Sequence, residues 1–256
     1  MNRLRGTAVI ALVLAGLAPP TLPARADVRV PVLLELFTSE GCSSCPPADA
    51  LLEQLDRTQP VAGAELIVLS EHVDYWNALG WKDPFSAKQF TDRQYEYAAQ
   101  IDEKDGAYTP ELIVDGRAGY VGSDADAVTA AIRRAVAAKK SPLDIQSATL
   151  EGDRVALRVQ ADATQNRSAV LYVALVQEHA SSHVLRGENA GRTLSHVGVV
   201  RNLTAIGKLP AQNAASRDAA IPLEGADASK GLRVVAFVQD ARTGAILAVA
   251  SRSLSS

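Results

Sequence analysis

The sequence predicts an α/β domain over residues 27–140, followed by an all-β, sandwich-like domain over residues 141–256. In the first part, continuous apolar runs alternate with segments whose apolar residues recur at helical spacing. In the second part, apolar and polar residues alternate, and turn-forming residues separate the runs. The pattern changes at residues 139–144, "KKSPLD", so we place the domain boundary there.

Residues 1–26 have the pattern of a secretory signal peptide. Arg3 and Arg5 precede an apolar run from Ala8 to Ala18, and the segment ends in the small-x-small sequence Ala24-Arg25-Ala26. The run is shorter than the roughly 20 residues that a membrane-spanning helix needs. We therefore expect cleavage after Ala26, a periplasmic or secreted protein, and no membrane insertion of the mature chain.

Composition narrows the possible partners. Cleavage would remove three basic residues and no acidic ones, which takes the formal charge from -3 to -6. A mildly acidic chain without basic clusters argues against nucleic acid and anionic lipid as partners. Two cysteines are too few to scaffold a chain of this length, although disulfides persist in exported proteins. The cysteines therefore need a separate explanation.

The first part begins with alternating buried strands and helices. Nearly continuous apolar runs predict strands at residues 30–37 and 65–70. Apolar residues at helical spacing follow two prolines at residues 46–55, and helical spacing returns within residues 84–101. This part of the chain therefore has the order strand, helix, strand, helix.

A hairpin and a third helix complete the first part. Asp115-Gly116 is a pair favoured in hairpin turns, so residues 109–122 are expected to form two strands. Ser123 is the expected N-cap of a helix with Val128, Ile132 and Val136 on one face.

The second part is expected to consist of short strands. Alternation predicts strands around residues 155–159, 171–175 and 234–238, with turns at 151–153, 165–167 and 243–244. Residues 213–231 are polar and rich in small side chains, so we expect a loop there.

Cys42 and Cys45 form a C-x-x-C motif between a predicted buried strand and an amphipathic helix. This spacing serves redox, zinc and haem sites. Haem attachment is excluded because the residue directly after Cys45 is not a histidine. A four-ligand zinc site would need further ligands, and the chain has no other cysteine. The start of a helix favours an ionised, accessible Cys42 thiolate, which would attack a partner disulfide before Cys45 releases the partner. We therefore expect a thiol–disulfide oxidoreductase acting on a protein or small-molecule thiol or disulfide, although its status as an enzyme stays open.

Several motifs resemble those of known families. The sequence Cys42-Ser43-Ser44-Cys45-Pro46, with Thr109-Pro110 before a later strand, resembles the thioredoxin-like superfamily. The stretches "LFTSEGCSSCPPAD", "LSEHVDYWNALGWKDPFS", "YTPELIVDG" and "RGENAGRTLSHVGVVR" are more closely similar to a secreted family, domain of unknown function 1223. This resemblance covers almost the whole mature chain. It implies a thioredoxin-like fold for residues 27–140 and implies no activity.

The thioredoxin-like resemblance also implies roles for three further residues. Pro110 would follow a cis peptide bond and face the cysteine pair, and the backbone of Thr109 would align a substrate chain. Glu35 lies near the position of a buried acid that takes the proton of the second cysteine, with one more residue before the motif than usual. Burial in an apolar run would raise the pKa of Glu35. Alternatively, Glu35 is paired or partly exposed at a bulge.

Two other functions remain open at this point. Two thiolates and an imidazole suit Cu(I), so Cys42, Cys45 and His72 would form a copper site in a non-enzymatic metallochaperone. In the other alternative, the cysteines form a permanent disulfide in a non-catalytic binding module. The thiol–disulfide oxidoreductase hypothesis requires no cofactor.

Two polar or aromatic segments also need a role. Trp76 and Trp81 follow the second strand, where they would either line a groove or fix the loop to its own domain. Residues 183–203 are unusually polar, which indicates either a loop that reaches a ligand or the first domain, or a salt-bridged domain interface.

Overall fold

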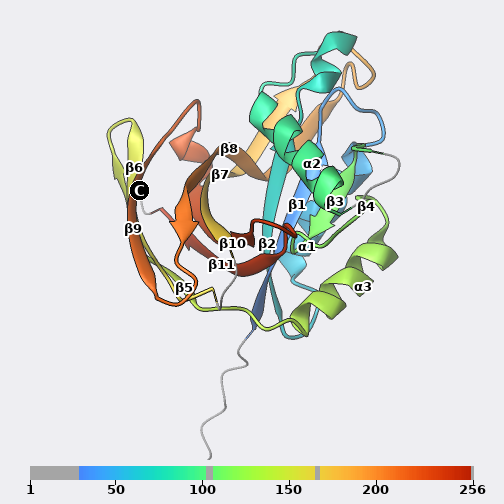
Figure 1. Cartoon of the computed structure of the whole chain (residues 1–256). Coiled ribbons are helices and arrows are strands. Elements are labelled where there is room, and N and C mark those ends of the chain that lie inside the picture. The colour runs from blue at the N-terminus through green and yellow to red at the C-terminus, as the bar shows by residue number, and fades with distance from the viewer. Residues whose placement is uncertain (1–28, 102–105, 165–167, 255–256) are drawn as a thin grey trace, which may run out of the picture.

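The structure is a computed structural model that describes residues 29–101, 106–164 and 168–254. The predicted signal peptide and the turn predicted at 165–167 lie outside these residues. The described part of the chain contains three α-helices and eleven strands (Figure 1). None of the helices in these ranges is both long and apolar enough to cross a membrane.

The elements of the first part follow the predicted order. They are β1 (Val30–Thr38), α1 (Pro46–Thr58), β2 (Ala64–His72), α2 (Lys88–Gln100), β3 (Glu111–Val114), β4 (Ala118–Val121) and α3 (Ala125–Val136). A short 3-10 helix, Tyr75–Leu79, lies between β2 and α2. The N-cap of α3 is Asp124, whose side chain accepts a hydrogen bond from Ala127 N. The expected cap at Ser123 was therefore wrong by one residue.

The second part contains seven strands and one short 3-10 helix. They are β5 (Leu143–Glu151), β6 (Arg154–Ala161), β7 (Ala169–His183), β8 (Thr193–Leu209), β9 (Ala215–Pro222), the 3-10 helix Ala228–Lys230, β10 (Leu232–Asp240) and β11 (Ile246–Ser253). The loop expected at 213–231 was wrong because this segment contains β9. That strand pairs with β6 along its whole length, although its alanines give little hydrophobic signal.

The predicted fold class, an α/β thioredoxin-like domain followed by a separate sandwich-like domain, is wrong. Eight strands from both parts form one mixed sheet in the order β11-β10-β7-β8-β2-β1-β3-β4. The two parts join where β2 pairs in parallel with β8. Periodicity along the chain indicates the type of each element, but it does not indicate which strands pair. The chain on both sides of residues 140 and 141 contributes strands to this sheet. The domain boundary expected there stays a prediction.

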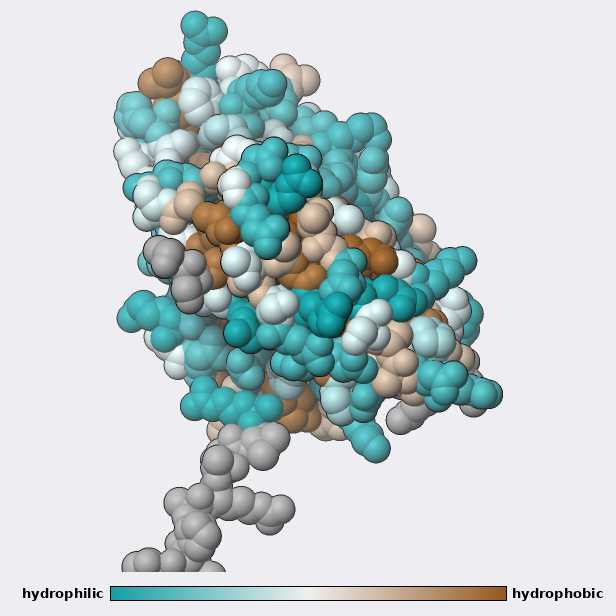
Figure 2. Space-filling model, turned by 90° about the vertical axis from the view of Figure 1, so that its left-hand side faces the viewer, coloured by the Kyte–Doolittle hydropathy of each residue, from teal (hydrophilic) through white to brown (hydrophobic). Residues whose placement is uncertain are grey.

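The remaining strands form a second sheet in the order β5-β6-β9. Figure 1 shows this small sheet on one side of the molecule and the helices on the other. Apolar residues of β6, β7 and β10 form a core between the two sheets. Figure 2 views the molecule from this side and shows apolar patches separated by hydrophilic residues.

The two faces of β1 support different cores. Leu34 and Leu36 pack with residues of α1 and α3. Leu33 packs with Phe90 of α2 and with Phe237 of β10, and this second core contains residues from both parts of the chain. Because neighbouring residues of a strand point to opposite faces, this alternation also decides where Glu35 lies.

Candidate functional site

The two cysteines lie in the segment between β1 and α1, residues 39–45, which we call the cysteine loop. Cys42 and Cys45 form a disulfide with their Cα atoms 5.4 Å apart, which confirms the expected disulfide. Cys45 immediately precedes Pro46 and Pro47, which suit a first helical turn because proline has no N–H and a fixed φ. The carbonyl of Cys45 accepts the backbone N–H groups of Ala48 and Asp49.

Both cysteines are completely buried. Cys42 and Cys45 have 0% exposed surface, whereas Ser43 and Ser44 between them are exposed. The accessible Cys42 sulfur that the sequence analysis expected is therefore covered in this conformation.

The connection between β7 and β8, residues 184–192, is hydrogen-bonded to the cysteine loop, and we call it the β7–β8 loop. The side-chain amide of Asn189 donates to the carbonyl oxygens of Glu40 and Cys42, both at 2.9 Å. Oε2 of Glu188 accepts the backbone N–H of Ser43 at 3.0 Å. Arg192 donates to Oδ1 of Asn189 at 2.8 Å and so orients its amide. The polar segment therefore reaches the first part of the chain at the cysteine loop.

Trp76 and Trp81, in the segment that follows β2, attach this segment to Thr109 and to the cysteine loop. Nε1 of Trp81 donates to Oε2 of Glu40 at 2.8 Å, and Nε1 of Trp76 donates to Oγ1 of Thr109 at 2.8 Å. A Cβ atom at Gly41 would lie 3.0 Å from Cβ of Trp76. These contacts match local packing, the second of the two roles considered for the tryptophans.

Thr109 and Pro110 lie beside the start of α1. Their peptide bond is cis, as expected. Pro110 is buried, and its carbonyl accepts Gly122 N at 2.9 Å. A Cβ atom at Gly122 would lie 3.3 Å from Cβ of Pro110 and 3.0 Å from Cβ of Ala48. Pro110 is therefore packed near the helical turn that follows Cys45.

Buried charges form a network beneath the cysteine loop. Nε2 of His196, on β8, lies 3.3 Å from Oε1 of Glu40, and its Nδ1 lies 3.7 Å from Oδ1 of Asp49. Asp49 also accepts a hydrogen bond from Oγ1 of Thr38 at 2.9 Å. Burial lowers the pKa of His196, but the interactions with Asp49 and Glu40 outweigh it and raise the pKa to about 10. His196 is therefore an imidazolium at neutral pH.

His72 and Asp83 extend this network. Nδ1 of His72 lies 2.7 Å from Oδ2 of Asp83, which also accepts Glu40 N at 2.8 Å. Burial raises the pKa of Asp83, yet the interactions with His72 and the backbone N–H groups dominate and lower it. The rings of His72 and His196 meet edge to face with centroids 4.6 Å apart. We call Glu40, Asp49, Asp83, His72 and His196 the acid–histidine network.

Most of this network was not predicted from the sequence. Glu40 and Asp49 flank the C-x-x-C motif in "SEGCSSCPPAD", which was the available signal. The residues expected to bind copper are arranged differently, because the two sulfurs are bonded to each other and His72 contacts Asp83. Within the ranges that the structure describes, no three His, Cys, Asp or Glu side chains are grouped to hold a metal ion.

Glu35 belongs to a different buried cluster. It points to the α2 face of the sheet, whereas Leu34 and Leu36 face α1. Nε of Arg93 donates to Oε1 of Glu35 at 2.7 Å, and the hydroxyl of Tyr97 donates to Oε2 at 2.5 Å. Glu35 is therefore paired, as in the second of the two alternatives, and it lies on the opposite sheet face from the helix that follows the cysteines.

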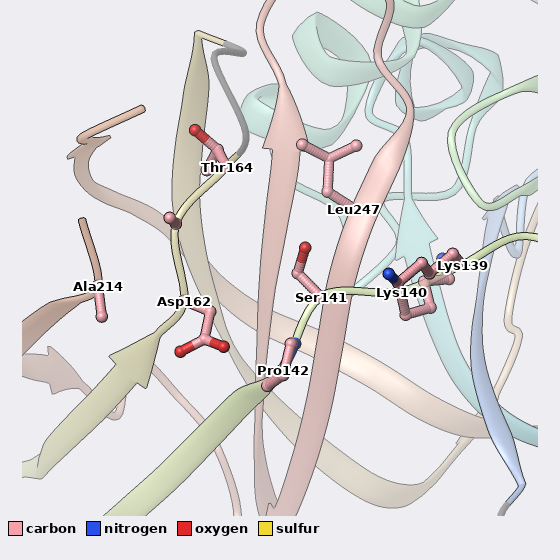
Figure 3. A pocket seen from close by; sticks show the side chains of 9 residues that line it. Lys139, Lys140, Ser141, Pro142, Asp162, Thr164, Ala214 and Leu247 are labelled. Atoms are coloured by element: carbon pink, nitrogen blue, oxygen red, sulfur yellow. The ribbon is translucent and has the colours of Figure 1, made fainter. Parts of the chain in front are cut away.

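A separate cavity of about 650 Å³ lies where the two parts of the chain meet (Figure 3). Lys140, Ser141 and Leu247 line it, and Nζ of Lys140 lies 2.7 Å from Oδ1 of Asp115. Asp115 also accepts the N–H of Leu33 near the start of β1. The cavity is therefore at the other end of β1 from the cysteine loop.

Comparisons with known proteins place this chain in a family. A family model described as "Protein of unknown function (DUF1223)" matches residues 33–239. The chain belongs to the DUF1223 family. No curated protein matches it.

A solved structure matches most of this DUF1223 chain. Protein AGR_C_4864 from Agrobacterium tumefaciens is 28% identical, with a TM-score of 0.62 over 87% of this chain and 93% of that chain. A β-glucosidase from Kluyveromyces marxianus is 13% identical, with a TM-score of 0.24 over 46% of this chain and 14% of that chain. The Escherichia coli curli protein CsgC is 12% identical, with a TM-score of 0.23 over 44% of this chain and 97% of that chain. The last two scores are too low to support an argument.

Proposed function

We propose that this DUF1223 protein exchanges disulfides with the thiols of a protein or small-molecule partner through Cys42 and Cys45. The observation that carries the proposal is the Cys42–Cys45 disulfide directly before the first turn of α1. Once the disulfide is reduced, the start of the helix favours the Cys42 thiolate. The signal-peptide pattern of residues 1–26 supports export to the periplasm or outside the cell, where disulfides persist.

The exchange proceeds in two balanced steps. A partner thiolate attacks the sulfur of Cys42, a bond forms between these two sulfurs, and Cys45 leaves as a thiolate that takes up a proton. A second partner thiolate then attacks the partner sulfur of the mixed disulfide and releases Cys42. The partner loses two electrons and the cysteine pair accepts them. In the reverse direction, Cys42 attacks a partner disulfide and Cys45 resolves the intermediate.

A second candidate is a non-catalytic binding module with a permanent disulfide. The complete burial of Cys42 and Cys45 favours it, because reactive cysteines are usually partly exposed.

Equilibration with glutathione redox buffers distinguishes the two candidates. The measurement is the fraction of oxidised protein after acid quenching, alkylation and mass spectrometry. Exchange predicts a reduction potential between about -270 and -120 mV, the range of the exchanging oxidoreductases. A disulfide that stays oxidised below about -300 mV would support the permanent disulfide instead. A Cys45→Ser variant is expected to accumulate the mixed disulfide at Cys42, whereas Cys42→Ser should not react.

A further inference from the structure

We propose that the cysteine loop binds the backbone of an extended, cysteine-containing polypeptide, and that the β7–β8 loop occupies this position until the polypeptide displaces it. This inference rests on the proposed exchange and names its class of substrate.

The hydrogen bonds at the cysteine loop have the pattern of peptide recognition. Two carbonyl acceptors, Glu40 O and Cys42 O, and one donor, Ser43 N, bond to side chains of the β7–β8 loop. Cys42 O also accepts the backbone N–H of Cys45 at 3.3 Å. The donor on that loop is the side-chain amide of Asn189, whose two N–H bonds would be replaced by two backbone N–H groups of an extended chain. The acceptor is a carboxylate oxygen in the place of a peptide carbonyl. An extended chain that pairs with a protein backbone supplies both kinds of group.

The β7–β8 loop is held in a way that permits displacement. Glu188 is exposed, so its hydrogen bond to Ser43 competes with water. Leu185, on the same loop, is 68% exposed and buries little apolar surface, so Val184 at the start of the loop is its one buried apolar side chain; Asn189 is also buried. Segments with few buried apolar contacts open at low free-energy cost. Displacement would uncover the sulfur of Cys42 and free Glu40 O and Ser43 N, while Cys42 O would still accept the backbone N–H of Cys45.

Apolar residues also border this position. A Cβ atom at Gly187 would lie 3.3 Å from Cβ of Trp81 and 3.7 Å from the carbonyl oxygen of Leu79. The β7–β8 loop therefore contacts the segment that follows β2. Leu79 belongs to the segment after β2, which stays in place, and it is 59% exposed. It would contact a side chain that flanks the cysteine of a bound polypeptide.

The test compares three reductants of the oxidised full-length mature protein. The first is an end-blocked seven-residue peptide with a central cysteine, the second is the same peptide with N-methyl groups on the residues flanking the cysteine, and the third is 2-mercaptoethanol. Rates are expressed per thiolate. We expect the N-methylated peptide to react about tenfold more slowly than its parent, because it cannot donate to the two carbonyl groups.

Variants of the β7–β8 loop provide the second measurement. The double variant Glu188→Ala/Asn189→Ala should react about tenfold faster with 2-mercaptoethanol, because the β7–β8 loop has lost its three hydrogen bonds to the cysteine loop. Glu188→Gln keeps an acceptor oxygen but loses the charge, so its rate should lie between those of the native protein and the double variant. Arg186→Ala, exposed on the same loop, is the matched control and should leave the rate unchanged.

The outcomes separate this inference from the proposed function. Equal rates for the two peptides with the native protein would overturn the peptide-binding inference and leave the exchange intact. That comparison needs no variant, so a folding defect in a variant cannot obscure it. A disulfide that reacts with none of the three thiols, in the native protein and in the folded double variant alike, would overturn the exchange and this inference together.

Discussion

His196 makes the stability of the protein depend on pH. Its side chain is buried and faces Glu40 and Asp49 as well as the ring of His72, and its pKa is raised from 6.5 to about 10. A raised pKa in the folded state means that protonation stabilises the fold. This contribution is fully present below about pH 6.5 and is lost as the pH rises through about 10.

We expect the free energy of unfolding to fall between about pH 7 and pH 10, by on the order of a few kcal/mol. Urea unfolding at a series of pH values measures it. In His196→Gln this part of the pH dependence should disappear, while the exposed His183→Gln serves as the control. An unchanged slope in His196→Gln would show that another group is responsible.

Arg93 is expected to be essential for stability and irrelevant to exchange. It is the buried counter-charge of Glu35 and lies 3.5 Å from Glu71, whose pKa is raised by burial. Arg93→Met leaves these buried carboxylates without a counter-charge, which costs about 3–5 kcal/mol of unfolding free energy in comparable buried pairs.

The control for this prediction is Arg158→Met, which breaks an exposed pair with Asp218 and should change stability little. Because Glu35 lies on the α2 face of the sheet, Glu35→Gln should leave the pH dependence of the exchange rate unchanged. A shift of that pH profile would restore the acid role that the sequence suggested for Glu35.

Sequence reasoning recovered the residues whose chemistry is encoded locally. A disulfide between Cys42 and Cys45 was expected and is present, and the resemblance correctly implied that Thr109-Pro110 is cis. It missed the acid–histidine network because Asp83 and His196 reach it from distant segments. A charge in a strand pattern does not show whether its partner lies nearby in space.

At the scale of elements, the turn between β3 and β4 packs closely against the turn between β10 and β11. A Cβ atom at Gly116 would lie 2.0 Å from the carbonyl oxygen of Gly244, in the turn between β10 and β11. Gly152 has the same φ of +63°, and a Cβ atom there would meet nothing within 4 Å. The two glycines therefore differ in packing and share their backbone conformation.

Gly116→Ala should lower the free energy of unfolding by roughly 1–3 kcal/mol more than Gly152→Ala, because overpacking adds to the common backbone strain. Thermal unfolding of both variants measures the difference. Equal losses of stability would show that backbone strain alone decides both substitutions.

Helices and hairpins were recoverable from the sequence because their signals are short-range. The spacing of Phe90 and Tyr97 indicated α2, and Asp115-Gly116 indicated the hairpin turn. The strand β9 was missed because Ala215, Ala219 and Ala220 resemble the small residues of a loop. Its pairing with β6 stabilises it as a strand.

At the scale of the whole molecule, the two parts of the chain are expected to unfold together. Leu33, Ile67 and Phe90 share a buried core with Val235 and Phe237, which belong to the second part. A fragment of residues 27–140 would expose this core surface and the edge of β2 that pairs with β8.

We therefore expect a single cooperative transition for residues 27–256, and no cooperative transition for residues 27–140 alone. Calorimetry and circular dichroism during urea unfolding measure both. A fragment that unfolds cooperatively with the stability of the full chain would support two independent domains. The sequence could not reveal this union, because β8 pairs with β2 over more than a hundred residues of intervening chain.

The position of Asn189 has a consequence for the order of events during synthesis. Its side-chain amide donates to the carbonyl oxygen of Cys42, which lies 147 residues earlier in the chain. A chain grows from its N-terminus, so Cys42 and Cys45 are made long before residues 184–192. Where the new chain meets an oxidant before residues 184–192 have folded, the two sulfurs can be joined, and folding of these residues then restricts access to them.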